Sequence, residues 1–136
     1  MGSIFVAYGG GDHRNAVLEF AVEQASASGY DLFVYHVQDS TTESVQSVRE
    51  EIEAVVQRTD PHIVYEIEID TRDEVSDRTN VSRQKRLVDA IHSGDREYEY
   101  VVMGDIERGS IEELTHSSMT EAVLETHTVP VLLVPI

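Results

Sequence analysis

The sequence predicts one α/β domain, covering residues 1–136, with a doubly wound parallel sheet of five strands in the order 3-2-1-4-5 and four flanking helices. Short apolar runs alternate along the chain with segments whose apolar residues recur at helical spacing. Glycines or an Asp-Pro pair separate most of these segments. The length is that of one ordinary domain, and it is sufficient for a core without disulfide bonds.

The first strand is predicted at Ser3–Tyr8, an apolar run that is followed by Gly9, Gly10 and Gly11. The next helix is expected to have Asp12 as its cap and Gly29 as its left-handed end. Its apolar face consists of Val17, Leu18, Ala21, Val22 and Ala25. The second strand is predicted at Asp31–Val37.

The second helix is expected to begin with a cap at Thr41 or Thr42 and to end at Asp60-Pro61. Its apolar face consists of Val45, Val48, Ile52, Val55 and Val56. His62–Ile69 alternates apolar and polar residues towards its end, which is typical of a half-exposed edge strand.

The remaining elements follow the same alternation. In chain order they are a helix at Val81–Ser93, a strand at Tyr98–Met103, a loop at Gly104–His116, a helix at Ser117–Thr126 and a strand at Val129–Pro135.

The composition is strongly acidic, with 26 Asp and Glu against 10 Lys and Arg, and a formal net charge of −16. This charge argues against binding to nucleic acids or to anionic membranes. Lys85 is the only lysine, and such acidic, lysine-poor chains resemble those of salt-accumulating archaea. The chain has no cysteine, its histidines lack metal-ligand spacing, and no basic segment precedes the first apolar run. We therefore expect a cytoplasmic protein without a metal.

Ligands of open α/β sheets bind beyond the carboxyl ends of the strands, where the strand order reverses. Here that point lies between the first and fourth strands, which are followed by Gly9 and Gly104. Glycine allows close approach of the main chain to a ligand, although both glycines also suit ordinary tight turns. Ser117 and Ser118 open the last helix, where they could cap it or face an anion.

Two long stretches resemble the universal stress protein family. They are FVAYGGGDHRNAVLEFAVEQASASGYDLFVYHV near the start and VVMGDIERGSIEELTHSSMTEAVLETHTVPVLLVPI at the end, whereas about Thr71–Arg86 matches poorly. The resemblance implies an adenine nucleotide alpha-hydrolase-like fold, frequent homodimers and, in one branch, ATP binding.

That branch binds ATP with an aspartate after the first strand and with the motif G-x-x-G, nine residues, G-S/T. The first motif glycine corresponds to Gly104 and the final serine to Ser118, and both are retained. Val37 matches an apolar position on the adenine side.

The other motif positions differ. Gly9 stands at the aspartate position, and Glu107 and Ser117 replace the second and third glycines. A carboxylate at Glu107 opposes a triphosphate, because two unit charges about 4 Å apart repel by roughly 1 kcal/mol even in water. The expectation is therefore a cleft without a cofactor, with ATP or AMP as the alternative ligand.

The last strand is wholly apolar, and an open apolar edge invites pairing with a second copy. We expect a homodimer with Val131 and Leu133, or Leu132 and Val134, at its seam. The predicted function is a non-enzymatic stress-response or regulatory domain that dimerises and binds an unidentified protein partner. The alternatives are a nucleotide sensor of the same fold and a weak phosphatase or phosphotransferase.

Overall fold

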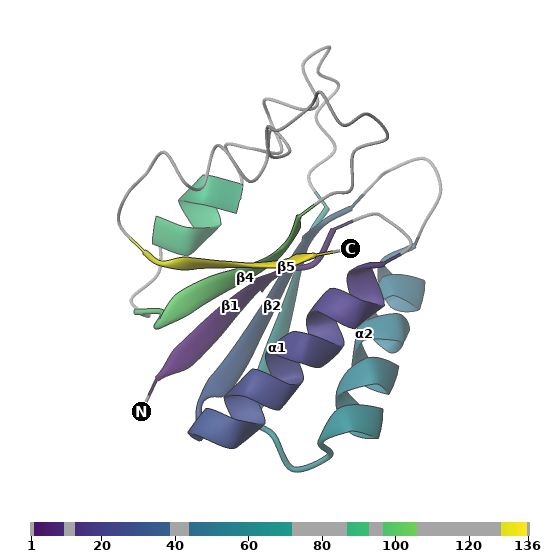
Figure 1. The fold of residues 1–136 in the computed structure, drawn as a ribbon. Coiled ribbons are helices and arrows are strands. Elements are labelled where there is room, and N and C mark those ends of the chain that lie inside the picture. Colours follow the sequence, from purple (N-terminus) through teal and green to yellow (C-terminus); the bar gives the residue numbers. More distant parts are fainter. Residues whose placement is uncertain are drawn as a thin grey trace.

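The computed structural model describes residues 2–9, 13–38, 44–71, 87–92, 97–105 and 129–135. These parts form one parallel sheet with the order β3-β2-β1-β4-β5 (Figure 1). The strands are β1 (Ser3–Ala7), β2 (Asp31–Val37), β3 (Tyr65–Asp70), β4 (Tyr100–Asp105) and β5 (Val131–Pro135). The predicted fold class and strand order are confirmed.

Helix α1 (Arg14–Ser28) joins β1 to β2 and ends as predicted at Gly29, which has φ 74°. Its predicted cap is wrong, because the N-cap position is His13, one residue after Asp12. The His13 side chain makes no capping hydrogen bond. Its carbonyl oxygen instead accepts from the N–H groups of Ala16 and Val17, so main-chain bonds begin the helix without a side-chain cap.

Helix α2 (Val45–Thr59) joins β2 to β3, and its cap also differs from the prediction of Thr41 or Thr42. Ser44 occupies the N-cap position, and its hydroxyl accepts from Ser47 N at 3.1 Å. The cap position depends on where the helix first packs on the sheet, and Val48 is the first fully buried residue of α2.

Strand β3 is the edge strand that the alternation predicts, although it begins at Tyr65, three residues after His62. Asp60 Oδ1 accepts from His62 N at 3.0 Å, which places His62 in the turn that follows α2. Part of the predicted third helix is present, since residues 87–92 are helical. The predicted helix 117–126 lies outside the described residues.

Two apolar clusters cover the two faces of the sheet. On one face α1 and α2 pack against β1, β2 and β4, with Leu18, Ile52 and Val102 fully buried. On the other face Leu87 and Ile91 of the helical segment pack on Phe5 and its neighbours. Figure 1 shows these helices on opposite sides of the sheet. Across the described ranges, no helix combines the length and the apolar character that a membrane span requires.

Candidate functional site

Three of the predicted site residues come together at the carboxyl edge of the sheet. Val37 ends β2, Gly9 follows β1, and Gly104 lies near the end of β4. Because β1 lies between β2 and β4, the three positions are on neighbouring strands. Gly9 is exposed, and a Cβ built there would meet no atom within 4 Å. The position of the predicted cleft therefore follows from the observed strand order.

The prediction that a loop begins at Gly104 is wrong. This residue lies inside β4, where it pairs with Val134 of β5. The sequence suggested a loop because glycine is depleted in strands, but pairing with β5 through Asp105 holds β4 extended beyond Met103. Ser117, Ser118 and Glu107 lie outside the described residues, so their predicted roles stay predictions.

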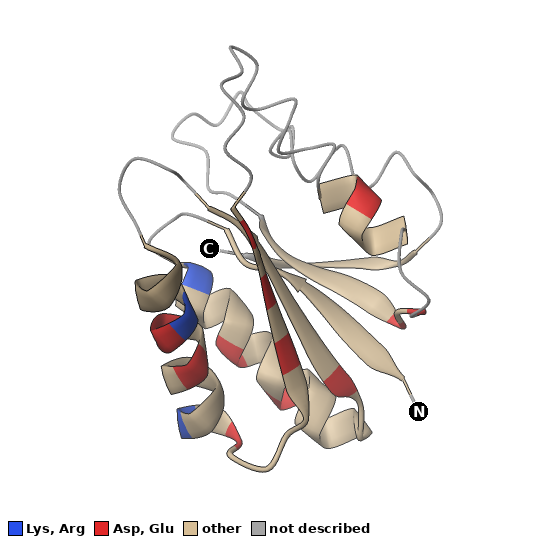
Figure 2. Cartoon of the chain, turned by 180° about the vertical axis from the view of Figure 1, so that it is seen from behind, with Lys and Arg blue, Asp and Glu red and all other residues tan. Residues whose placement is uncertain are grey.

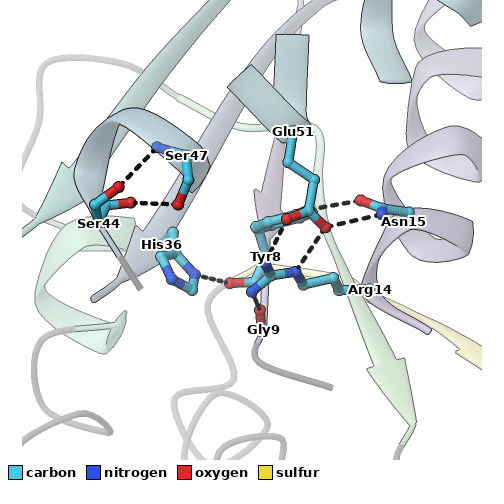
Figure 3. A network of polar contacts seen from close by, with 8 residues as sticks. All are labelled: Tyr8, Gly9, Arg14, Asn15, His36, Ser44, Ser47 and Glu51. Atoms are coloured by element: carbon cyan, nitrogen blue, oxygen red, sulfur yellow. Dashed lines mark hydrogen bonds and ion pairs between the residues drawn. The ribbon is translucent and has the colours of Figure 1, made fainter. Parts of the chain in front are cut away.

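An ion pair beside Gly9 is the centre of a polar network that joins β1, α1 and α2 (Figure 3). Arg14, the first residue of α1, donates to both carboxylate oxygens of Glu51, with Nε–Oε2 3.1 Å and Nη2–Oε1 2.6 Å. Its Nη1 also donates to the Gly9 carbonyl oxygen at 3.2 Å. The geometry is bidentate, the arrangement in which guanidinium and carboxylate bind most strongly.

Tyr8 and Asn15 extend this network into the buried layer below. The Tyr8 hydroxyl donates to Asn15 Oδ1 at 2.6 Å, and Asn15 Nδ2 donates to Glu51 Oε2 at 2.8 Å. The Arg14 guanidinium carbon lies 4.7 Å from the centre of the Tyr8 ring, which is a cation–π distance. One carboxylate thereby organises three side chains around the end of β1.

His36 connects the same point to β2. Its side chain is buried, and its Nδ1 lies 2.7 Å from the Tyr8 carbonyl oxygen. Because a carbonyl oxygen only accepts, this contact implies that Nδ1 carries the proton. The ring also packs edge-on against Tyr8, with centroids 5.6 Å apart. The main chain that leads into Gly9 is thus held from both sides.

The network shifts the acidity of its members in opposite directions. The Arg14 hydrogen bonds are the main reason why the pKa of Glu51 falls from 4.5 to about 2, and bonds from Tyr8 and Asn15 add to this. Burial, and next the neighbouring Glu51, raise the pKa of Tyr8 well above its ordinary value. At neutral pH the site therefore contains a carboxylate, a guanidinium and a neutral phenol.

Sequence reasoning missed this network, because its members are far apart in the chain. Arg14 and Glu51 are separated by 37 positions, and nothing in the sequence distinguishes Glu51 from the neighbouring Glu50 and Glu53 of α2. Two of its hydrogen bonds are local, between Tyr8 and Asn15 at a separation of 7 and between Arg14 and Gly9 at a separation of 5. Among the described residues no cluster of His, Cys, Asp or Glu could hold a metal ion.

Comparison with known proteins agrees with this architecture. The model of the universal stress protein family matches residues 1–135. The chain belongs to this family. A comparison of the chain with curated proteins finds no match.

Solved structures of universal stress proteins share the fold. One from Archaeoglobus fulgidus has a TM-score of 0.72 at 19% identity, with 98% of each chain covered. Another from the same organism, in complex with dAMP, has a TM-score of 0.61 at 18% identity, covering 98% of this chain and 97% of its own. A universal stress protein in complex with cAMP has a TM-score of 0.69 at 16% identity, covering 98% and 96%. These likenesses confirm the adenine nucleotide alpha-hydrolase-like fold.

Proposed function

We propose that this universal stress protein is a non-catalytic regulatory domain that dimerises along β5, binds a protein partner and holds no ATP. The observation that carries the proposal is the difference between the two edges of the sheet. Leu132 on β5 is an exposed apolar side chain, with 37% of its surface accessible. On β3 the exposed side chains are the carboxylates of Glu66 and Glu68. Charged side chains are a common protection of edge strands, and β5 has none.

The direction of the main-chain groups on β5 supports pairing with a second copy. Val101 N donates to Pro130 O, and Val101 is in register with Val131. In a parallel ladder the residues that face one neighbour alternate, so Leu132 faces β4 with its main chain. The N–H and C=O groups of Val131 and Leu133 therefore point to the outer edge.

A two-fold axis can satisfy these groups in one antiparallel register. Val131 of each copy then lies opposite Leu133 of the other, and both exchange hydrogen bonds. Leu132 lies on the axis as a non-hydrogen-bonded pair, in which the Cα atoms are about 4.5 Å apart and the side chains touch. A register centred on Leu133 would pair Val131 with Pro135, which has no N–H, and would leave the Val131 carbonyl without a donor; the register centred on Leu132 completes both bonds of each pair.

Sedimentation velocity at micromolar concentration in molar KCl tests the dimer. We expect a dimer for the native chain and a monomer for Leu132→Glu, because two like charges would lie opposite each other at the axis. Val64→Glu is the matched control, since Val64 is 66% exposed next to β3 and its replacement should leave the dimer intact. A monomeric native chain contradicts the proposal.

The absence of ATP binding is supported by the charges beside Gly9. Gly9 lacks the carboxylate that an ATP-binding relative places there. Arg14, the basic residue that contacts the Gly9 carbonyl, is neutralised by the Glu51 carboxylate at 2.6 Å. A phosphate here would compete with this bidentate pair for the guanidinium. Calorimetry with Mg-ATP in molar KCl should show no heat of binding, and saturable micromolar binding would contradict this part of the proposal.

A nucleotide sensor is the second candidate, and the similar structures in complex with dAMP and cAMP favour it. A monophosphate carries less charge than ATP, and the exposed Gly9 leaves room at the carboxyl edge. The test is whether the purified protein releases a nucleotide on denaturation, measured by absorbance and mass spectrometry. A released adenine nucleotide in stoichiometric amount would replace the first proposal by this one.

A further inference from the structure

The outer edge of β3 presents a regular row of main-chain groups. Leu32 N donates to Val64 O, and Gln38 N donates to Asp70 O. The alternation of a parallel ladder then directs the main chain of Glu66 and Glu68 towards β2 as well. The N–H and C=O groups of Tyr65, Ile67 and Ile69 consequently point away from the sheet. In the part of the chain that the structure describes, no strand pairs with this edge.

The side chains of β3 are sorted by charge between its two faces. Tyr65, Ile67 and Ile69 are half-buried and pack on the cluster below α1 and α2. Glu66 and Glu68 project from the opposite face, where they are exposed beside Phe33 and Tyr35 of β2. Figure 2 shows the acidic positions following one another along β3. The strand contains no proline.

The outward main-chain groups of β3 and the different charge of its two faces determine which kind of strand can pair with this edge. A residue directly opposite another on a neighbouring strand has its side chain on the same face. A second copy of β3 would place carboxylates opposite carboxylates, which destabilises pairing. A strand with lysine or arginine at alternate positions, and apolar residues between them, would instead match both faces. The net charge of −16 attracts such a partner in the same way over a longer range.

We propose that the outer edge of β3 is the partner-binding surface of this domain, and that it accepts an extended, alternating basic and apolar segment of another protein as an added strand. This mode of recognition uses main-chain hydrogen bonds for affinity and alternate side chains for selectivity. The inference names the partner class within the proposed partner-binding function. It is separate from dimerisation, because β3 and β5 are the opposite edges of the sheet.

A short peptide of alternating lysine and valine is the probe, and a peptide of the same composition with its lysines and valines in two separate blocks is the control. Binding is followed by amide chemical shifts of the full-length protein at low salt. We expect saturable binding of the alternating peptide, at least tenfold tighter than the blocked peptide, with the largest shifts at Tyr65, Ile67 and Ile69. The double variant Glu66→Lys and Glu68→Lys should lose this binding.

The matched control is the double variant Glu97→Lys and Glu99→Lys just before β4, which reverses the same number of exposed charges at a place that β1 and β2 separate from β3. It should retain at least about a third of the affinity. Equal binding of both peptides, shifts centred on β5, equal losses in the two double variants, or no binding would each overturn the inference. Sedimentation of the same samples keeps the outcomes distinct, since a dimer that binds no peptide contradicts only the β3 inference.

Discussion

Replacing Glu51 by glutamine tests the network beside Gly9 most directly. The lowering of its pKa from 4.5 to about 2 is equivalent to about 3 kcal/mol, because each tenfold change in proton affinity is worth about 1.4 kcal/mol. The Glu51 side chain is 34% exposed, so solvent screening reduces the expected loss of stability to about 1–2 kcal/mol. Arg14, only 14% exposed, would lose its counter-charge.

The assay is urea unfolding at a fixed, molar KCl concentration. At pH 7 the midpoint of Glu51→Gln should lie lower by roughly 1 M urea, given a slope of about 1–3 kcal/mol per M for a domain of this size. A carboxylate with a depressed pKa stabilises the fold above pH 4.5, and this contribution is lost as the pH falls towards 2. The difference between native chain and variant should therefore shrink to less than about half by pH 3.

Glu50→Gln is the control, since the adjacent carboxylate is exposed and contacts Gln46 within its own helix. It should change the free energy of unfolding by less than about 0.5 kcal/mol at every pH. The reasoning fails if Glu51→Gln has an equally small effect at pH 7. It also fails if the loss at pH 3 equals the loss at pH 7, because the ionised carboxylate would then not be its source.

Three further predictions concern the scaffold. Gly29→Ala should destabilise the fold by about 1 kcal/mol through its φ of 74° alone, because no atom lies within 4 Å of the new Cβ; unchanged urea midpoints would contradict this. Ser44→Ala should cost about 1 kcal/mol by removing the cap of α2, whereas Ser44→Asn should retain the stability, and equal losses in both would argue against capping. The thermal midpoint should rise between about 0.1 and 2 M KCl as the net charge of −16 is screened, and a flat profile in calorimetry would refute that explanation.

The sequence predicted the ends of helices and strands correctly where residues close to each other in the chain determine them. Gly29 ends α1 as predicted because only a residue tolerant of positive φ fits there. The strand Asp31–Val37 has its predicted bounds, since a continuous apolar run bounded by turn signals is a strong local pattern. The sequence predicted the N-caps of the helices less well. His13 takes the place predicted for Asp12 in α1, and Ser44 takes the place predicted for Thr41 or Thr42 in α2. Several polar residues precede each helix, and packing on the sheet selects among them.

The sequence predicted the position of the candidate site in the fold, but not which residues form it. Parallel alternation, with strand order 3-2-1-4-5, is enough to put Gly9, Val37 and Gly104 at one edge. It does not reveal that Gly104 belongs to β4, because that depends on pairing with Val134. The roles of Ser117 and Ser118 stay predictions.

By itself, the sequence determined the fold, the family, the acidic surface and the apolar last strand, because periodicity, charge and motif spacing are properties of neighbouring residues. Only the tertiary structure decided which distant side chains meet. It brought Glu51 of α2 to Arg14 and Asn15 of α1 and closed a network below Gly9. It also set the register of β3 on β2, which turns the main-chain groups of Tyr65, Ile67 and Ile69 to the outer edge. Both results depend on the packing of elements that lie far apart along the chain, which no local pattern records.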